Sequence, residues 1–177
     1  MPFEFIKTEM LYKGRAFAIR RDFLKTPDGR ETKLDIVEHG GSVVLVPVDG
    51  EGNILFVRQY RHATGKDLLE LPAGTRDEDE PYLVCAAREI REETGMEAGK
   101  LVKVGEFFLA PGYSTEFMAV FIATELKVNP LQADEDEFLE LERIPIQKAF
   151  EMAEKGEVLD AKSLAGLLLA RPHLKAD

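Results

Sequence analysis

Short apolar segments of strand length make up most of the chain, and turns rich in glycine or proline separate them. Two of these segments, residues 17–25 and 30–38, flank Pro27-Asp28-Gly29, whose composition is typical of a tight turn. The first 40 residues are therefore expected to form a β-hairpin region. The further expected strands cover residues 43–48, 54–61, 101–109, 117–124 and 138–144. Because strands come first and do not alternate regularly with helices, the pattern favours an α+β fold over a doubly wound sheet.

Three helices are expected, and residues that favour helix ends mark them. Pro81 suits the start of a helix and Gly95 suits a C-terminal cap, while Asp160 is a suitable N-cap for the last helix. The expected helices cover residues 82–94, 145–156 and 161–171.

Each of these helices has an apolar face. In the first helix this face carries Leu83, Ala86, Ala87, Ile90 and Thr94. In the second helix this face carries Ile146, Ala149, Phe150 and Ala153. In the last helix the apolar stripe consists of Leu164, Leu167 and Leu168.

Three glutamates, Glu89, Glu92 and Glu93, share the opposite face of the first helix. A like-charge pair one turn apart costs about 0.2–0.5 kcal/mol in an exposed helix, and acids near a helix C-terminus also oppose its dipole. Arg88 can reach Glu92 but cannot neutralise all three carboxylates. A divalent cation would remove the repulsion, and ligands that are all oxygen favour Mg²⁺ or Mn²⁺ over zinc. For an arbitrary glutamate-rich helix, a solvated acidic face is the alternative.

Composition excludes several classes of protein. The chain has 33 acidic against 23 basic side chains, a net charge of −10, which argues against binding nucleic acid through a general basic surface. A single cysteine excludes an intrachain disulfide and a multi-cysteine zinc site. No apolar run approaches the roughly 18 residues that span a bilayer, and the first residues lack the pattern of a signal peptide. A cytoplasmic protein with one main domain is therefore expected.

The sequence around the first helix resembles the Nudix box. The pattern of the box is Gly-x5-Glu-x7-Arg-Glu-(apolar)-x-Glu-Glu-x-Gly-(apolar). Its fixed positions are occupied here by Gly74, Glu80, Arg88, Glu89, Ile90, Glu92, Glu93, Gly95 and Met96. The resemblance implies a Nudix hydrolase domain over residues 41–177, folded as an α/β/α sandwich with a mixed sheet. It also implies hydrolysis of a nucleoside diphosphate linked to another group, with Mg²⁺ as cofactor and Mn²⁺ as its substitute.

By position, the box also implies roles for individual residues. Arg88 would orient the carboxylates, and Glu80 would close the loop onto the helix. Glu92 would bind the metal directly or lie just behind the ligands. The implied metal ligands on the loop and helix are the backbone oxygen of Ala73 and the side chains of Glu89, Glu92 and Glu93.

Other segments resemble the ADP-ribose pyrophosphatase branch of this family. Residues 109–116, Leu-Ala-Pro-Gly-Tyr-Ser-Thr-Glu, are similar to its Pro-Gly-x-Ser-x-Glu element, and residues 56–61 and 69–74 also resemble it. The resemblance implies hydrolysis of ADP-ribose to AMP and ribose 5-phosphate. The implied substrate-binding residues are Arg61 for a phosphate, Glu116 for the terminal ribose hydroxyls, Gly112 and Ser114 for the shape of that end, and Glu70 near the nucleoside or the metals.

An acidic run, Asp134-Glu135-Asp136-Glu137, precedes the last expected strand. A solvated charged loop is the ordinary interpretation of such a run. In the branch that the chain resembles, an acidic loop here supplies a catalytic base and a further metal ligand. The resemblance assigns Glu135 as the base and Glu137 as the metal contact, although the two roles can be exchanged.

The same branch implies a homodimer, in which the N-terminal hairpin region exchanges with the partner subunit and helps to hold adenine. The candidates for the adenine contact are Phe17, Arg20, Arg21 and Lys33, and the sequence does not choose among them. Two alternatives to ADP-ribose hydrolysis stay open. One is hydrolysis of another sugar nucleotide or of a dinucleoside polyphosphate, and the other is a sensor that binds ADP-ribose without cleaving it.

Overall fold

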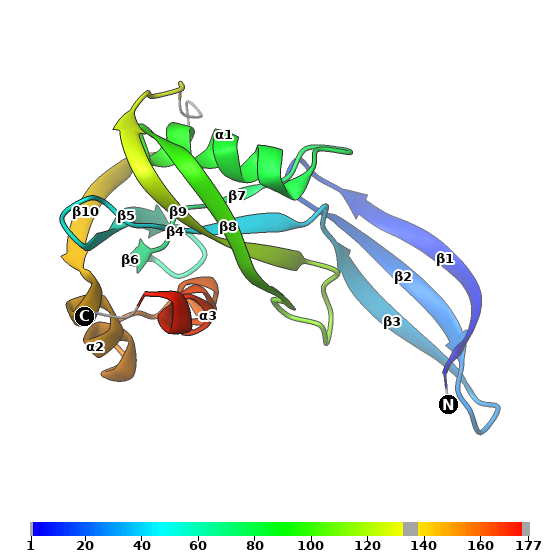
Figure 1. The fold of residues 1–177 in the computed structure, drawn as a ribbon. Helices are drawn as coiled ribbons and strands as arrows, with labels where there is room; N and C mark the ends of the chain where they lie inside the picture. The colour runs from blue at the N-terminus through cyan, green and yellow to red at the C-terminus, as the bar shows by residue number, and fades with distance from the viewer. Residues whose placement is uncertain (1, 133–137, 175–177) are drawn as a thin grey trace. The chain divides into compact units, whose positions relative to one another are not determined.

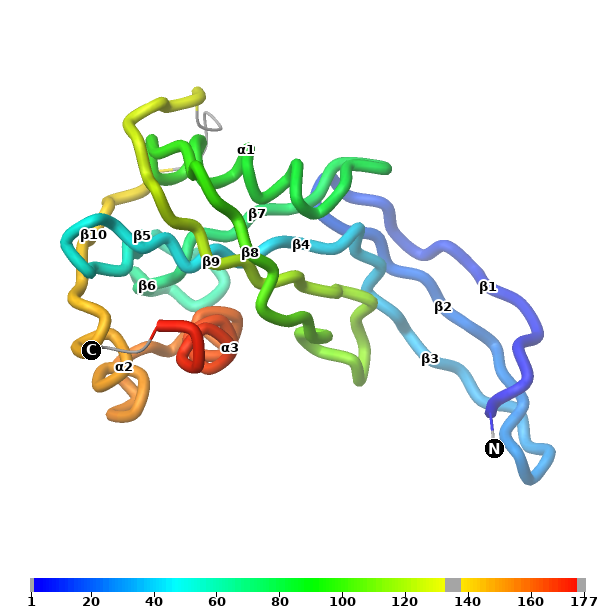
Figure 2. Tube along the Cα trace, viewed as in Figure 1, coloured from blue at the N-terminus to red at the C-terminus, as the bar shows by residue number. Residues whose placement is uncertain are grey.

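The structure, a computed structural model, describes residues 2–132 and 138–174. The chain divides into two compact units, which Figure 1 draws as a ribbon and Figure 2 as a tube. Unit 1 comprises Met1–Gly41 and Phe107–Met118, and unit 2 comprises Ser42–Glu106 and Ala119–Asp177. None of the helices in the described part of the chain has the length and apolar character needed to span a bilayer.

Unit 1 contains a three-stranded antiparallel sheet in the order β1-β2-β3 (Figure 1). The strands are β1 (Glu4–Lys13), β2 (Ala18–Lys25) and β3 (Glu31–Glu38). The last two form the expected hairpin, and Gly29 in its turn has a φ of +87°, which glycine adopts without a steric penalty. The sequence analysis does not predict β1. All of its residues are exposed in this chain, and it lacks the alternation of apolar and polar residues that identifies a strand.

The second segment of unit 1 forms a turn that bonds to β3. The backbone N–H of Val37 donates to the carbonyl of Tyr113 (N···O 2.8 Å), and the N–H of Thr115 donates to the carbonyl of Val37 (3.0 Å). The hydroxyl of Thr115 also accepts a hydrogen bond from the N–H of His39 (2.9 Å). The Pro-Gly-x-Ser-x-Glu element is thus held on β3 by main-chain hydrogen bonds.

Two further sheets have the strand orders β7-β4-β9-β8 and β10-β5-β6. β5 pairs antiparallel with both of its neighbours, and β4 pairs antiparallel with β7. The strands are β4 (Ser42–Pro47), β5 (Asn53–Arg61), β6 (Lys66–Glu70), β7 (Ala73–Thr75), β8 (Met96–Phe108), β9 (Phe117–Val128) and β10 (Leu139–Pro145). The five longer strands confirm the expected ones, whereas the short strands β6 and β7 are not predicted.

The three predicted helices are confirmed. They are α1 (Tyr82–Thr94), α2 (Ile146–Glu154) and α3 (Ala161–Ala170), and a short 3₁₀ turn, Arg171–His173, follows the last. Gly95 ends α1 in the left-handed conformation, with φ at 71°, and the Asp160 side chain caps α3. The helix ends are therefore determined by local chemistry that is visible in the sequence.

Strand β4 packs against both α1 and α3. It can do so because successive side chains of a strand point to opposite faces of the sheet. On one face, Val43 and Leu45 pack in a buried cluster with Ile90 of α1. On the other face, Val44 lies against Gly166 of α3, where an added Cβ would sit 3.2 Å from a methyl group of Val44. This arrangement is the core of the predicted α/β/α sandwich.

The predicted buried face of α1 is partly wrong. Leu83 is 54% exposed and Ala87 is also exposed, whereas Cys85 and Glu89 are buried. The buried arc is turned toward the glutamate side because the backbone at Gly74 packs directly against the Glu89 carboxylate.

The predicted stripe of α3 also needs correction. Leu168 is 70% exposed and Leu164 is 37% exposed, while the polar residues Lys162 and Ser163 are buried. Both buried residues bond to the chain that leads from β6 to β7, so polar contacts rather than apolar packing orient this face.

Candidate active site

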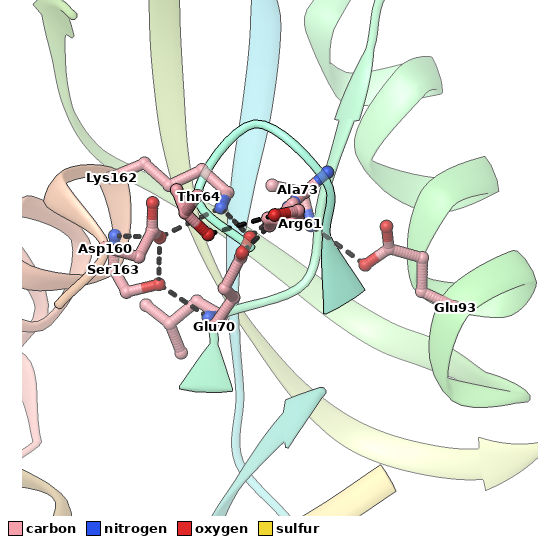
Figure 3. Close-up of polar contacts among 9 residues, drawn as sticks. Arg61, Thr64, Glu70, Ala73, Glu93, Asp160, Lys162 and Ser163 are labelled. Atoms are coloured by element: carbon pink, nitrogen blue, oxygen red, sulfur yellow. Dashed lines mark hydrogen bonds and ion pairs between the residues drawn. The ribbon is translucent and has the colours of Figure 1, made fainter. Parts of the chain in front are cut away.

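Helix α1 brings two glutamates to residues 70–74, the segment that links β6 to β7 and is called the linking segment below. The carboxylate of Glu93 accepts a hydrogen bond from the backbone N–H of Ala73 (Oε2···N 3.0 Å; Figure 3). Glu89 lies beside the next residue, since a Cβ added to Gly74 would sit 1.7 Å from the Glu89 carboxyl carbon. Only glycine leaves room here for that carboxylate. Three residues of the box, Gly74, Glu89 and Glu93, therefore lie together with Ala73, the residue before it.

Arg88 connects the other carboxylates of the box. Its Nη1 donates to Glu89 Oε1 (2.7 Å) and to Glu92 Oε2 (2.8 Å). Its Nε and Nη2 donate to the two oxygens of Glu80 (3.1 and 2.9 Å), and Nη2 also reaches the carbonyl of Thr75 (3.2 Å). One guanidinium thus bridges the helix and the loop before it, which is the kind of forked contact that arginine supplies and lysine does not.

These contacts shift the ionisation of both partners. The hydrogen bond to Glu80 is the largest cause that raises the pKa of Arg88, and the charge of Glu89 adds to it. Conversely, the hydrogen bond from Arg88 holds the pKa of Glu80 below its ordinary value, against the opposing effect of burial. Both groups are therefore charged at neutral pH, and Glu80 closes the loop onto the helix.

The donor set suits a hard divalent cation. Carboxylate and carbonyl oxygens from Ala73, Glu89, Glu92 and Glu93 are of the type that Mg²⁺ and Mn²⁺ prefer. The missing side chain of Gly74 admits the Glu89 carboxylate, which is 10% exposed, to the backbone at that point. Within residues 2–132 and 138–174, no three acidic, histidine or cysteine side chains are already arranged as a metal site.

A second charged group lies at the start of the linking segment. Arg61 donates through Nε and Nη2 to the two oxygens of Glu70 (2.8 and 2.7 Å), and Lys162 of α3 also bonds to Glu70 (Figure 3). Burial alone would raise the pKa of Glu70, but the hydrogen bond from Arg61 and the charge of Lys162 outweigh it and lower that pKa. Glu70 is thus a buried, charged carboxylate that holds Arg61.

Helix α3 holds the same segment from the side opposite α1 (Figure 3). The hydroxyl of Ser163 accepts a hydrogen bond from the backbone N–H of Leu71 (2.7 Å). Asp160 in turn accepts from the Ser163 backbone N–H (3.0 Å) and from Lys162 (2.9 Å). The linking segment is therefore bonded to α3 at residues 70 and 71 and to α1 at residue 73.

The predicted substrate residues of unit 1 lie in the turn on β3. The hydroxyl of Ser114 accepts a hydrogen bond from the backbone N–H of Glu116 (3.1 Å), and Gly112 is exposed with open space at its Cα. Glu135 and Glu137, the predicted base and further metal contact, lie outside the residues that the structure describes.

Cys85 is the one cysteine of the chain, and it is fully buried in the core beside Ile90. Burial raises the pKa of its thiol, and the nearby carboxylates of Glu89 and Glu80 raise it further. A thiol that is buried and protonated at neutral pH does not serve as a nucleophile.

Sequence reasoning missed Lys162 and Ser163 and predicted Asp160 only as a helix cap. One signal in the sequence could have found Lys162. It is the one charged residue in the helix Ala-Lys-Ser-Leu-Ala-Gly-Leu-Leu-Leu-Ala. Its partner Glu70 is 92 residues away, and no local pattern reports a pair at that separation.

The comparison with protein families gives a match to the NUDIX domain over residues 38–167. The chain belongs to the Nudix family. In this Nudix protein the match covers the linking segment, all of the box and most of α3.

Several curated relatives match the chain over most of its length. It is 36% identical to an ADP-ribose pyrophosphatase of Bacillus subtilis, over 89% of this chain and 86% of the relative. It is 39% identical to an ADP-ribose pyrophosphatase of Mycobacterium tuberculosis, over 94% and 82%. A methanol dehydrogenase activator of Bacillus methanolicus is 33% identical, over 90% and 87%.

Among solved structures, a crystal structure of an ADP compounds hydrolase superposes with a TM-score of 0.87 at 24% identity. The match covers 98% of this chain and 95% of the other. This likeness confirms the predicted α+β Nudix fold.

Replacing Gly74 by alanine tests the close approach of Glu89. The added Cβ would displace the Glu89 carboxylate, so we expect Mn²⁺ affinity to fall by about 10–100-fold, as when the surroundings of a metal ligand are disturbed. Electron paramagnetic resonance measures free Mn²⁺ in a titration of the protein. Gly50→Ala is the matched control, because a Cβ there meets no atom within 4 Å. Equal Mn²⁺ affinity of the two variants would contradict the placement of Glu89.

Replacing Glu80 by glutamine tests the loop closure. Because the folded state lowers the pKa of Glu80, its contribution to stability is present above the ordinary carboxyl pKa and is lost as pH falls through the lowered value. At pH 7 we expect the free energy of unfolding to fall by about 1–2 kcal/mol, and the difference from the unchanged chain to shrink below about pH 4. Urea unfolding at several pH values measures this.

Glu78→Gln is the control for that experiment, since Glu78 is exposed in the same loop. Its effect on unfolding should stay within about 0.5 kcal/mol at every pH. If Glu80→Gln lowers the free energy of unfolding equally at pH 3 and pH 7, the ion pair with Arg88 is not the cause of the destabilisation.

Proposed function

We propose that this chain hydrolyses the diphosphate bond of ADP-ribose and gives AMP and ribose 5-phosphate. The observation that carries the chemistry is the approach of Glu93 to the Ala73 N–H and of Glu89 to Gly74, which brings two carboxylates of the box to adjacent backbone residues. The substrate assignment is supported by the two relatives named ADP-ribose pyrophosphatase, 36% and 39% identical over most of the chain.

The cofactor in this proposal is Mg²⁺, with Mn²⁺ as a substitute. Ala73, Glu89, Glu92 and Glu93 would hold it, together with Glu137. A bound divalent cation offsets the charge of a diphosphate and makes water a better nucleophile. Within the chain, Arg88 orients Glu89 and Glu92 through its hydrogen bonds, and the Ala73 N–H orients Glu93.

Arg61 is proposed to bind a phosphate of the substrate. Its side chain is 42% exposed, and the bonds to Glu70 use Nε and Nη2, so Nη1 stays on the side away from that carboxylate. A guanidinium held in this way loses little freedom when it binds a phosphate oxygen. Glu70 is buried and fully engaged, so we assign it to positioning Arg61 rather than to contact with the nucleoside.

The remaining substrate and base assignments follow the resemblance. Glu116 would accept hydrogen bonds from the terminal ribose, with Gly112 and Ser114 beside it. Glu135 would take the proton of the attacking water as a general base. The water oxygen then bonds to phosphorus, and the second phosphate leaves with the electrons of the broken anhydride bond.

The proposal also includes an assembly. Residues 1–40 would serve in a homodimer, and residues 41–177 would carry the hydrolase. The exposed apolar side chains of β1, which are Phe5, Ile6, Met10, Leu11 and Tyr12, support a role for this strand in contact with a second copy. We place the protein in the cytoplasm.

A sugar nucleotide other than ADP-ribose is the second candidate substrate. The observation that favours it is a GDP-mannose pyrophosphatase of Salmonella arizonae, 35% identical over 80% of this chain and 78% of the relative. The two candidates share the chemistry of the box and differ only in the nucleoside and sugar that the pocket accepts.

Product analysis with Mg²⁺ present tests the proposal. ADP-ribose should yield AMP and ribose 5-phosphate with a kcat/KM at least tenfold above that for GDP-mannose or a dinucleoside polyphosphate. Glu93→Gln should lower kcat by about a thousandfold or more, because it removes a proposed metal ligand. The same substitution at exposed Glu97, just after the box, should leave kcat unchanged. A higher kcat/KM for GDP-mannose would overturn the substrate, and a normal kcat in Glu93→Gln would overturn the metal assignment.

A further inference from the structure

Lys162 is a buried lysine, with 11% of its side chain exposed, in a helix whose other side chains are small or apolar. A lysine is rarely buried unless its charge is paired, because an unpaired ammonium loses its hydration without compensation. Here the Nζ atom lies between two carboxylates and bonds to both Glu70 and Asp160 (Figure 3). The position of the charge is therefore specific, and it adjoins the ion pair of Arg61.

Ion pairs around Glu70 join four charges that balance one another, and the charge of the Glu93 carboxylate also acts on Arg61 from outside this group. Arg61 and Lys162 are the two cations, and Glu70 and Asp160 are the two anions. The Asp160 charge is further met by the backbone N–H of Ser163 at the start of α3. Without Lys162 the group would carry one net negative charge, next to the arginine that is proposed to bind an anionic phosphate.

We propose that Lys162 is a positioning residue for substrate binding, which neutralises Glu70 so that Glu70 can hold Arg61 without cancelling its attraction for the substrate diphosphate. The inference rests on the proposed function, because it takes Arg61 as a phosphate ligand. A carboxylate alone would orient the guanidinium but would also repel the phosphates. With Lys162 on the other side of Glu70, the guanidinium keeps its fixed direction and the site keeps its charge balance.

A purely structural role for Lys162 gives a different expectation. In that case the lysine would only anchor α3 to the linking segment. A second substitution among the four charged residues would then add to the harm done by the first. The electrostatic role predicts instead that a second substitution can repair the first. Removing the negative charge of Glu70 from a variant that lacks Lys162 restores the charge balance, because Arg61 and Asp160 then remain as one cation and one anion.

Calorimetric titration in the presence of EDTA tests this without turnover or metal. The ligands are ADP-ribose and inorganic pyrophosphate, and the variants are Lys162→Met, Lys162→Gln, Glu70→Gln and the double variant Lys162→Met with Glu70→Gln. Each Lys162 variant should raise the Kd about tenfold. In the double variant the charge balance is restored, but glutamine offers Arg61 one acceptor oxygen in place of two. The double variant should therefore bind more tightly than Lys162→Met and more weakly than the protein without substitutions. Lys155→Met is the control. The Lys155 side chain is 59% exposed, and its Nζ lies 3.8 Å from Glu151 Oε2 in a loose surface pair.

Thermal unfolding shows which variants are folded, and Lys162→Gln carries the comparison if Lys162→Met does not fold, because glutamine keeps a hydrogen-bond donor but removes the charge. A Kd unchanged in the Lys162 variants, or a double variant that binds as weakly as the single one, would overturn the inference. Binding of pyrophosphate without ADP-ribose would refute the proposed substrate while the inference is still judged on pyrophosphate. Binding of neither by the unchanged chain would refute Arg61 as an anion site, and the inference with it.

Discussion

The hydrogen bonds and ion pairs that hold residues 70–74 between two helices are the constraint on which the rest of the site depends. On one side, Glu93 of α1 accepts from the Ala73 N–H, and on the other, Ser163 of α3 accepts from the Leu71 N–H. Strand β4 separates the two helices and packs on both through alternate side chains. The hydrophobic core thus sets the spacing of the helices, and the polar bonds place a few backbone atoms between them.

This arrangement explains how one short segment can serve two tasks. Its first residue, Glu70, fixes Arg61, which is proposed to bind an anionic substrate. Its later residues, Ala73 and Gly74, adjoin the carboxylates proposed to hold a cation. In both tasks a charged group that is proposed to bind a ligand lies beside a group of opposite charge, and it must keep its attraction for that ligand. Two cations with defined hydrogen bonds meet that need: half-buried Arg88 for the carboxylates and buried Lys162 for Glu70.

The sequence predicts the parts of this structure that depend on local chemistry. Gly95 and Asp160 end or begin their helices through bonds within a few residues, and the box spacing alone groups Glu89 with Gly74. It does not predict which face of a helix is buried when distant polar partners decide. Lys162 is buried and Leu168 is exposed because Glu70 pairs with the lysine on this face of α3. Glu70 lies 92 residues away in the sequence, and helical periodicity contains no information about such a pair.

The most direct test of this account is a crystal structure of the chain with Mg²⁺ and an ADP-ribose analogue whose bridging oxygen is replaced by a methylene group. We expect an ion about 2.1 Å from the Ala73 carbonyl oxygen and from carboxylates of α1. The diphosphate should contact Arg61 while Glu70 keeps its bonds to both Arg61 and Lys162. A diphosphate bound elsewhere, or an ion site that does not include Glu89 and Glu93, would contradict the account.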